Sequence, residues 1–496
     1  MDLHERLGFN SNPFATFSAE EEGDFIDEVF VRPLYLNSLK NDISNGHSRF
    51  ILGARGVGKT SLVMQLRTYC NNNYIFSVIV DDYEGVKLTD NKADILLLMI
   101  ENITRDYCIT LSKNPHLIRP LSRDDKEKLS FIIECFFRTI SKGEFEDRCN
   151  SVTHFKTKNF FKKILNVLFN KPINIFISGV VEILSTTVRS SLGLPDPNKE
   201  DFYKSYLPEF STERPTASQL NDGIKSDEKA LKRILMDLSQ IINNSGLGKP
   251  VILFDKIDEY PSLSGNTTSI SNFIEAILKD TTLLLNQSYS LVFSLWDAIR
   301  TDLNSKGVRF DKIKPVDISW SNEQLIEMFD KRLSYFSDGL VDSIKFIQDD
   351  DARNRIIKLA NGSPRYLFRL LSVIYDQQCD INPEVDNIQA ESIALGMKQY
   401  CLLFEFYAAF PGKRGSKDDV MISVNRLLKI GSLQITTKDF VNEYKVSTGS
   451  ALNYIKSLLE FSLIKKIGND EGKTYLYEVT HPVIKHMIEQ GINSID

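Results

Sequence analysis

The chain has 496 residues, of which 42% are hydrophobic and 25% charged, and its formal net charge is -6. This length exceeds what one hydrophobic core supports, so we expect two or three domains with the ordinary composition of a soluble globular protein. The mildly acidic balance excludes a whole-chain argument for nucleic-acid binding and leaves only a local basic patch open.

The cysteine pattern and the hydropathy of the chain indicate in which cellular compartment we expect the protein. The six cysteines form no Cys-x-x-Cys pair and no zinc-type cluster with the six histidines, so we expect reduced thiols in a cytoplasmic protein. The first residues lack a signal-peptide pattern, and no run of ~18 apolar residues occurs. Residues 160–188 are the nearest approach to a membrane signal; we interpret them as a buried or partner-facing segment, with an interfacial membrane helix as the alternative. We therefore expect no stable membrane insertion.

Residues 53–60 read Gly-Ala-Arg-Gly-Val-Gly-Lys-Thr, between an apolar run at 50–52 and apolar residues at helical spacing. Glycines let backbone N–H groups approach phosphate oxygens closely, Lys59 reaches the β- and γ-phosphates, and Thr60 ligates Mg²⁺. The pattern predicts a nucleoside triphosphate site at a helix N-terminus, with ATP and Mg²⁺ as its cofactors. The expected binding residues are Gly53, Ala54, Arg55, Gly56, Val57, Gly58, Lys59, Thr60 and Ser61.

Further apolar and β-branched runs predict the rest of a parallel α/β sheet. The predicted strands are residues 74–80, 251–254, 288–295 and 313–318. The separation between Lys59 and Asp255 is larger than a minimal core requires, so an insertion is expected at about 88–221, with a helical pattern at 126–139. A docking, regulatory or oligomer surface and a structural elaboration are equal alternatives for this insertion.

The run at 251–254 ends in Asp255, as in a central strand that is buried on both faces and has its carboxyl end at the ligand. A triphosphate site needs a carboxylate there to hold the water shell of the metal, so Asp255 joins Thr60 as a metal-associated residue. Asp258 and Glu259 follow and complete an Asp-x-x-Asp-Glu pattern that resembles the acidic motif of STAND-type ATPases. The resemblance implies that Asp258 or Glu259 polarises the attacking water, with helix capping as the alternative.

The last third of the chain is predicted to be mainly helical. A serine cap at Ser321 opens a helical lid over 321–412, which leaves residues 1–320 for the ATPase core. From 413 to 496, helix starts at 436 and 447 and strands at 463–467 and 475–479 follow the order of a winged helix. Lys and Arg exceed Asp and Glu there by only two, which is weak for a duplex binder. Packing on the ATPase is the alternative to DNA contact through Asn453, Lys456, Lys465, Lys466 and Lys473.

The phosphate loop, the acidic stretch at 255–259, the Gly-Ser-Pro-Arg at 362–365 and the terminal winged helix together resemble AAA+/STAND-type P-loop ATPases with an origin-recognition-like layout. The resemblance implies that Arg365 reaches the phosphates from the lid, that Ser294 senses the γ-phosphate, and that Arg32 lies near the adenine. It also implies an arginine inserted into the site of a neighbouring subunit, for which Arg309 is the candidate and Arg300 competes. A polar strand end and solvated surface arginines are the structural alternatives.

The same resemblance implies an ATP-controlled regulatory switch that assembles as a homo-oligomer, acts with a protein effector and belongs to a bacterial phage-defence or mobile-element system. Lys256 stands where many relatives carry a catalytic glutamate, so hydrolysis does not follow from binding. Two other functions remain: a DNA-binding initiator or loader that contacts duplex DNA through the winged helix, and a nucleotide-binding scaffold without turnover.

Overall fold

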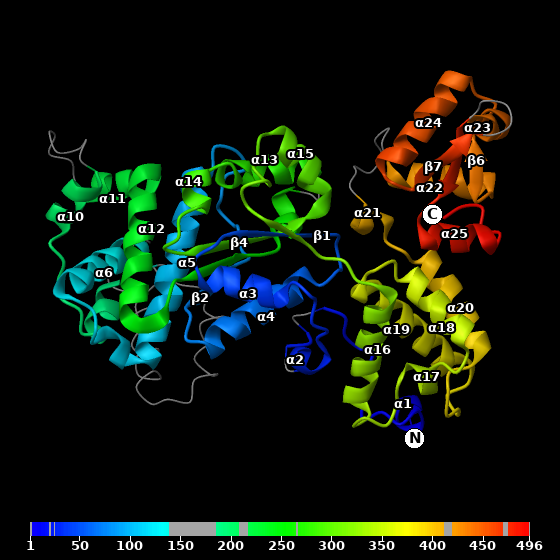
Figure 1. The fold of residues 1–496 in the computed structure, drawn as a ribbon, viewed down its shortest axis with the longest axis horizontal. Coiled ribbons are helices and arrows are strands. Elements are labelled where there is room, and N and C mark those ends of the chain that lie inside the picture. Colours follow the sequence, from blue (N-terminus) through cyan, green and yellow to red (C-terminus); the bar gives the residue numbers. More distant parts are fainter. Residues whose placement is uncertain are drawn as a thin grey trace, which may run out of the picture.

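The computed structural model describes residues 2–18, 21–23, 25–137, 185–207, 217–263, 266–410, 419–469 and 475–495. These residues form an α/β lobe and a helical lobe, with a smaller module at the C-terminal end of the helical lobe (Figure 1). The N-terminus lies beside the helical lobe, far from the sheet.

A five-stranded parallel sheet is the frame of the α/β lobe, as predicted. Its spatial order is β2-β3-β4-β1-β5. The strands are β1 (Arg49–Gly53), β2 (Ser77–Val80), β3 (Val251–Phe254), β4 (Ser290–Trp296) and β5 (Pro315–Asp317). Strands β3 and β4 are buried at every position because helices cover both faces. Strand β4 separates β1 from β3, so the carboxyl ends of the loop strand and the Asp255 strand lie two positions apart at one edge.

Alternate strand residues meet different helices on the two faces of the sheet. On one face Ile51, Leu253 and Val292 pack with α3 (Leu36–Ser44) and α4 (Lys59–Asn72). On the other face Phe50, Phe254 and Phe293 pack with α5 (Lys92–Lys113), α12 (Glu228–Ile242) and α13 (Thr267–Leu278). The phosphate loop is therefore anchored in a strand and a helix that are both fixed by apolar packing.

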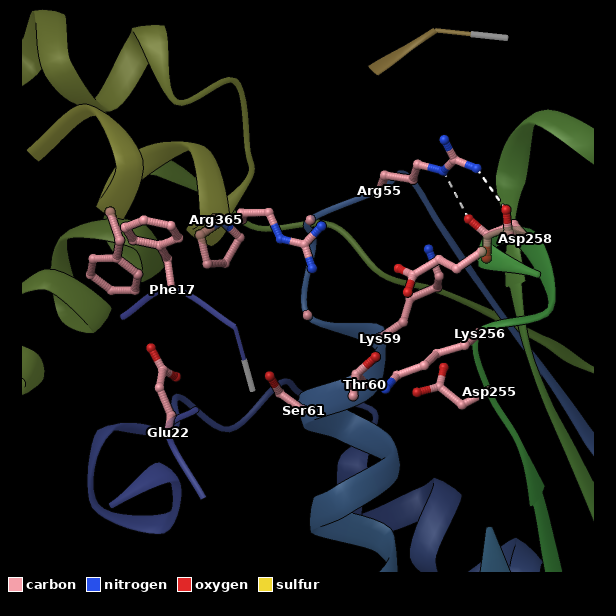
Figure 2. Close-up of a pocket in the computed structure, with 15 residues that line it drawn as sticks. Phe17, Glu22, Arg55, Lys59, Thr60, Ser61, Asp255, Lys256, Asp258 and Arg365 are labelled. Carbon is pink, nitrogen blue, oxygen red and sulfur yellow. Dashed lines mark hydrogen bonds and ion pairs between the residues drawn. The ribbon is translucent and has the colours of Figure 1, made fainter. Parts of the chain in front are cut away.

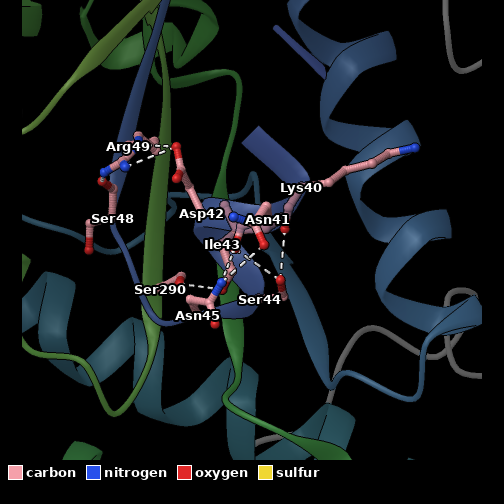
Figure 3. A network of polar contacts seen from close by, with 9 residues as sticks. All are labelled: Lys40, Asn41, Asp42, Ile43, Ser44, Asn45, Ser48, Arg49 and Ser290. Atoms are coloured by element: carbon pink, nitrogen blue, oxygen red, sulfur yellow. Dashed lines mark hydrogen bonds and ion pairs between the residues drawn. The ribbon is translucent and has the colours of Figure 1, made fainter. Parts of the chain in front are cut away.

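A polar network ties the end of α3 to the beginnings of β1 and β4 (Figure 3). The Arg49 guanidinium pairs with Asp42 at 2.9 Å, and the Ser290 hydroxyl donates to the carbonyl of Ile43 at 2.6 Å. The N–H of Leu291 donates to the Ser48 hydroxyl at 3.2 Å. These bonds fix the amino ends of β1 and β4 relative to α3.

The described part of the insertion packs against α5 and α12, the helices that cover one face of the sheet, and shares their apolar core. The helix predicted at 126–139 is α6 (Arg123–Phe136), and Phe131 contacts rings of α10 (Lys199–Tyr206) at 5.1–5.8 Å. Helix α11 (Ala217–Ser226) completes this group, and the predicted buried or membrane-facing segment at 160–188 lies almost entirely outside the described residues. Short elements of the lobe are η1 (Pro115–Ile118), η3 (Asn243–Leu247), η4 (Ile257–Glu259), η5 (Pro261–Leu263), α14 (Thr281–Leu284), η6 (Asp297–Ile299) and α15 (Arg300–Ser305).

The helical lobe begins at the predicted serine cap, where the Ser321 hydroxyl accepts from the N–H of Gln324. Its helices are α16 (Asn322–Phe336), α17 (Ser343–Phe346), α18 (Asp350–Leu359), α19 (Pro364–Ile381) and α20 (Ala390–Leu402). The N-terminal helices α1 (Leu3–Arg6) and α2 (Ile26–Val29) lie against this lobe (Figure 1). Phe14 contacts the rings of Phe329 and Phe346 at 6.3 and 5.4 Å. We expected residues 1–320 to form the ATPase core, but the apolar residues of the first segment lie in the core of the lid helices.

The C-terminal module contains the elements predicted there. They are α21 (Phe406–Ala409), α22 (Val420–Ile430), β6 (Gln434–Thr436), α23 (Thr437–Tyr444), α24 (Thr448–Glu460), β7 (Ile464–Asn469), β8 (Tyr475–Val479) and α25 (Pro482–Glu489). Its strands form an antiparallel sheet in the order β6-β8-β7. The apolar core of the module is continuous with that of the helices of the helical lobe, so the two parts are packed against each other.

Two sequence expectations concern the described residues as a whole. None of the helices in the described ranges is long and apolar enough to cross a membrane. The five cysteines in those ranges are free thiols, and burial raises the pKa of Cys70 and of Cys401 to about 12. These thiols are therefore weak nucleophiles.

The crossing of α19 and α20 depends on one glycine. A Cβ at Gly396 would lie 2.7 Å from both Cα and Cγ1 of Ile374, a backbone atom and a buried branched side chain. We expect Gly396→Ala to destabilise the helical lobe by about 1–3 kcal/mol, because the helices must separate. Gly449→Ala is the matched control: a Cβ there meets only the Ser447 hydroxyl, at 3.8 Å, so this change should be neutral or stabilising by up to ~1 kcal/mol. Urea unfolding monitored by circular dichroism measures the stability of both variants. Equal unfolding midpoints for Gly396→Ala and Gly449→Ala would show that the close packing of α19 and α20 does not require Gly396.

The environment of His481 leads us to expect that the stability of the helical lobe and the C-terminal module depends on pH. Its ring lies among Phe404, Phe406 and Phe410 at 5.3–6.1 Å, and burial lowers its pKa from 6.5 to about 4. The folded state favours the neutral ring. The contribution of His481 to the free energy of unfolding is therefore complete above pH ~6.5 and decreases as the pH falls towards 4, by up to about 3 kcal/mol.

The variant His481→Gln should lose this part of the pH dependence. Urea unfolding at pH 7 and pH 5 measures it, with the exposed His116 changed to Gln as the control. A pH dependence that persists unchanged in His481→Gln would contradict the assignment.

Candidate functional site

A pocket lies at the carboxyl edge of the parallel sheet, between the α/β lobe and the helical lobe (Figure 2). Three parts of the chain line it: the phosphate loop, the turn after β3, and a group from the N-terminal segment and α19. The lining residues are Phe17, Glu22, Arg55, Gly56, Gly58, Lys59, Thr60, Ser61, Asp255, Lys256, Asp258, Glu259, Pro364, Arg365 and Phe368.

The loop at 53–60 curls around the N-terminus of α4 as the glycine pattern predicts. Gly56 and Gly58 have φ angles of +80° and +89°, a conformation that costs a side-chain-bearing residue free energy. Gly58 is also the residue that caps α4. The unpaired N–H groups of the first turn and the positive end of the helix dipole therefore face the pocket, an arrangement that binds phosphate.

Lys59 lies at the centre of the pocket. Its ammonium donates to the carbonyls of Gly53 and Ala54 at 3.0 and 3.1 Å. Burial lowers the pKa of Lys59, and the nearby Asp258 and Asp255 act against that shift. The ammonium thus adds positive charge close to the loop N–H groups, where phosphate oxygens would lie.

Asp255 follows β3 and is only 3% exposed. Burial raises the pKa of its carboxyl group, while the hydroxyls of Ser294 and Thr60 face the carboxylate and favour its charged form. The Ser294 Oγ is buried in β4 and has no hydrogen bond of normal geometry within the described ranges, so its relation to Asp255 is a close approach rather than a formed bond. Thr60 and Asp255 together present hydroxyl and carboxylate oxygens, the donors that Mg²⁺ prefers.

Asp258 is engaged by the phosphate loop itself. The Arg55 Nε donates to its carboxylate at 2.9 Å, and Nη2 donates to its backbone carbonyl at 2.8 Å. The guanidinium also lies over the Trp296 ring at 4.3 Å, and its Nη1 is 3.5 Å from the carbonyl of Ala408 in α21. Because Asp258 is 4% exposed and ion-paired, its carboxylate is less available to a water molecule than that of Glu259, which is exposed at the pocket wall.

Lys256 has a left-handed backbone with a φ of +56°, unusual for a residue with a side chain. It precedes the short helix η4, which carries Asp258 and Glu259. In Figure 2 its side chain extends beside Asp255 towards Thr60. The sharp turn after β3 therefore directs a second lysine into the pocket together with the acidic residues.

The helical lobe contacts the loop directly at the start of α19. The Ser363 hydroxyl and the N–H of Arg365 donate to the carbonyl of Gly56 at 3.0 and 3.3 Å. The Trp320 indole N–H donates to the carbonyl of Val57 at 2.7 Å. The Arg365 side chain lines the pocket and points towards the loop (Figure 2).

Three arginines from the sequence analysis lie elsewhere on the chain. Arg309 is exposed and forms a two-point ion pair with Asp311 at 2.8 and 2.6 Å. Arg300 pairs with Asp317 at 2.8 Å. Arg32 is exposed, and neither it nor the other two is among the described residues that line the pocket. Within one chain the structure does not bring these arginines to the pocket.

Sequence reasoning missed four residues at or near the site. Phe17, Glu22 and Phe368 line the pocket but belong to no motif. Asp297 follows β4, and its charge acts on Lys59, while burial raises the pKa of Asp297. Its position directly after the predicted strand at 288–295 was a usable signal, because polar residues at strand ends of this edge face the ligand.

No family model matches this chain, and no curated protein matches it. Among solved structures, a Walker-type ATPase of Pyrococcus abyssi has 13% sequence identity over 96% of both chains, with a TM-score of 0.36. The RuvB Holliday junction branch migration motor of Thermotoga maritima has 11% identity over 96% of this chain and 98% of that chain, with a TM-score of 0.33. The assignment of the fold therefore rests on the geometry of the chain itself. A parallel sheet whose loop strand continues through residues 53–60 into α4 is the fold of a P-loop NTPase.

Proposed function

We propose that the chain binds ATP with Mg²⁺ and acts as an ATP-controlled switch. The observation that carries the proposal is the phosphate loop around the N-terminus of α4, with Lys59 and Thr60 facing Asp255 across one pocket. Backbone N–H groups and Lys59 bind the phosphates, and Arg365 adds a cation from the helical lobe.

The donor set at the metal position fits magnesium. Thr60 would ligate the ion, and Asp255, held beside it at the end of β3, would hold its water shell. When bound, the ion draws negative charge from the phosphate oxygens and makes the γ-phosphoryl group a better target for attack. Lys59 orients the β- and γ-phosphates independently of that effect.

The lid contacts support a switch rather than an isolated binding site. Ser363 and Arg365 bind the loop carbonyl of Gly56, so a phosphate that moves the loop also moves the start of α19. Arg365 would then bind the same phosphates through its side chain. The ligand would thus favour one orientation of the helical lobe by its contacts with both lobes.

Within this proposal Glu259 activates the attacking water. It is the exposed carboxylate of the pocket wall, whereas the Asp258 carboxylate is held by Arg55. Glu259 would accept the proton of the water. Ser294, the γ-phosphate sensor that the resemblance implies, is fully buried and is not among the described residues that line the pocket, so it would act through Asp255 rather than by direct contact. A scaffold that binds without turnover remains the alternative, because Lys256 occupies the position after Asp255.

We infer protein partners rather than DNA for the C-terminal module, which we propose is a winged helix. Glu478 of β8 pairs with Lys465 at 2.9 Å and with Lys485 at 3.2 Å, and Lys466 lies over the Tyr475 ring at 3.2 Å. Hairpin cations that are already engaged contribute less to duplex affinity, which depends on phosphate neutralisation. Assembly as a homo-oligomer with Arg309 at the neighbouring site, a protein effector, and a role in phage defence or mobile elements are proposals that rest on the resemblance.

The binding step is tested with Lys59→Ala. Removing the ammonium should weaken ATP binding at least 100-fold, because it contacts the phosphates through charge-assisted hydrogen bonds. Isothermal titration calorimetry with ATP and Mg²⁺ measures this. Lys314→Ala, an exposed lysine outside the pocket, is the control and should bind like the original chain. Undiminished binding by Lys59→Ala would refute the site.

The hydrolysis step is tested with Glu259→Gln against Asp258→Asn. Loss of the base should lower turnover by roughly 10²- to 10⁴-fold with ATP binding retained. Asp258→Asn should instead loosen Arg55 and alter affinity, because it removes an ion pair from the loop. Phosphate release in a single turnover measures both. Turnover that Glu259→Gln leaves unchanged would contradict the role of Glu259, and binding without turnover in the original chain would favour the scaffold.

A further inference from the structure

The nucleotide pocket has a second end that no sequence motif accounts for. Phe17 and Glu22 of the N-terminal segment and Phe368 of α19 form it. In Figure 2 Phe17 and Glu22 lie on the Ser61 side of the helix N-terminus, away from Asp255. Because the γ-phosphate and the metal belong on the Asp255 side, the opposite end is where the base of a bound nucleotide would lie.

Aromatic side chains give this end a surface for a planar ring. The Phe17 side chain is 36% exposed, and Phe368 is largely buried beneath the pocket. Stacking on an aromatic side chain strengthens the binding of any nucleobase, because it uses the face of the ring and not the polar groups on its edge. Phe17 and Phe368 therefore explain base binding but not a choice among bases.

Glu22 is the polar group at this end, and a buried arginine holds it in place. Its carboxylate forms an ion pair with Arg332 of α16, which is fully buried. The other donors of Arg332 bond to the N-terminal segment: Nε to the carbonyl of Pro13 at 2.5 Å, and Nη2 to the carbonyl and the hydroxyl of Thr16. The guanidinium also lies over the Phe368 ring at 4.3 Å.

The backbone at Glu22 is held as well. Its carbonyl accepts from the N–H groups of Phe25 and Ile26 at 2.9 and 2.8 Å, in the turn before α2. The carboxylate is therefore fixed at both its backbone and its side chain. A buried carboxylate in a fixed position can discriminate among ligands. A ligand that offers no hydrogen-bond donor to the carboxylate binds more weakly, because the buried carboxylate oxygen is then left without a partner.

The chemistry of the carboxylate defines its ligand. An ionised carboxylate only accepts hydrogen bonds, and Arg332 occupies Oε1, so Oε2 can accept from a donor on the base edge. We propose that Glu22, positioned by Arg332, accepts a hydrogen bond from the 6-amino group of adenine and so determines base specificity at this site. This inference rests on the proposed ATP site and adds its specificity-determining residue. A 6-oxo group, as in guanine, would place an acceptor against the carboxylate and be rejected.

The test compares triphosphates that differ only in the base. ATP, purine riboside triphosphate and GTP are each competed, with Mg²⁺, against an ATP analogue that is labelled on its ribose. Purine riboside triphosphate keeps the stacking ring but lacks the 6-amino group. We expect ATP to bind roughly 10- to 100-fold more tightly than purine riboside triphosphate, the range of a hydrogen bond to a charged group. GTP should bind more weakly still.

Glu22→Gln identifies the residue responsible. The ratio of the ATP and purine riboside triphosphate affinities should fall to about threefold or less, because a neutral carboxamide is the weaker acceptor. The ratio is the chosen readout because partial unfolding would weaken both ligands equally. Glu21→Gln, at the exposed neighbouring carboxylate, is the matched control and should keep the original ratio.

Each other outcome has a defined meaning. Equal binding of ATP and purine riboside triphosphate by the original chain overturns the inference, as does a ratio that Glu22→Gln leaves unchanged while both affinities fall. If neither triphosphate binds, the proposed function itself fails. If both bind equally and Lys59→Ala abolishes both, the nucleotide site stands and only the role of Glu22 is lost.

Discussion

The backbone carbonyl of Gly56 is the point on which the arrangement of the two lobes depends. It accepts from Ser363 and from the N–H of Arg365, so the α/β lobe and the helical lobe meet on the phosphate loop itself. A side chain at Gly56 would place its Cβ 2.8 Å from the Ser363 hydroxyl, so the contact with the helical lobe favours glycine here, as does the φ angle of +80°. Since the N-terminal segment and the C-terminal module share a core with the lid helices, a change at this carbonyl reaches most of the chain.

One buried and one partly buried ion pair fix the walls of the pocket around that point. Arg332 with Glu22 ties the N-terminal segment to α16, and Arg55 with Asp258 ties the loop to the turn after β3. Such pairs add little net stability, because desolvation offsets the attraction, but removing one partner leaves an unpaired buried charge and is strongly unfavourable. Their effect is therefore on geometry: each pair admits one arrangement of two segments that are far apart in sequence.

The sequence was sufficient where structure follows from local patterns. The five strands, the cap at Ser321 and the α24 start are set by apolar runs and capping residues, and all are present. The surroundings of the site were not predictable in the same way. Phe14 and Glu22 find their partners more than 300 residues away, and no periodicity in short helices signals such contacts. Likewise, the pairing of Arg55 with Asp258 depends on the turn at Lys256, whose left-handed backbone no residue preference indicates.

Under the proposed function, the charges that line the pocket favour tight binding of phosphates more than fast turnover. Lys59, Lys256 and Arg365 line the pocket as cations, whereas one of the two candidate carboxylates after Asp255 is neutralised by Arg55. The remaining one, Glu259, is exposed, and a solvent-exposed base is less preorganised than one in a water-excluded site. Under the proposed function, ATP would therefore persist on a single chain, and a protein surface that covers Glu259 would exclude bulk water, orient the carboxylate and speed hydrolysis. Such a switch would stay closed until its partner binds. The partner would recognise the ATP-bound state and, by covering Glu259, would also speed the hydrolysis that returns the chain to its open state.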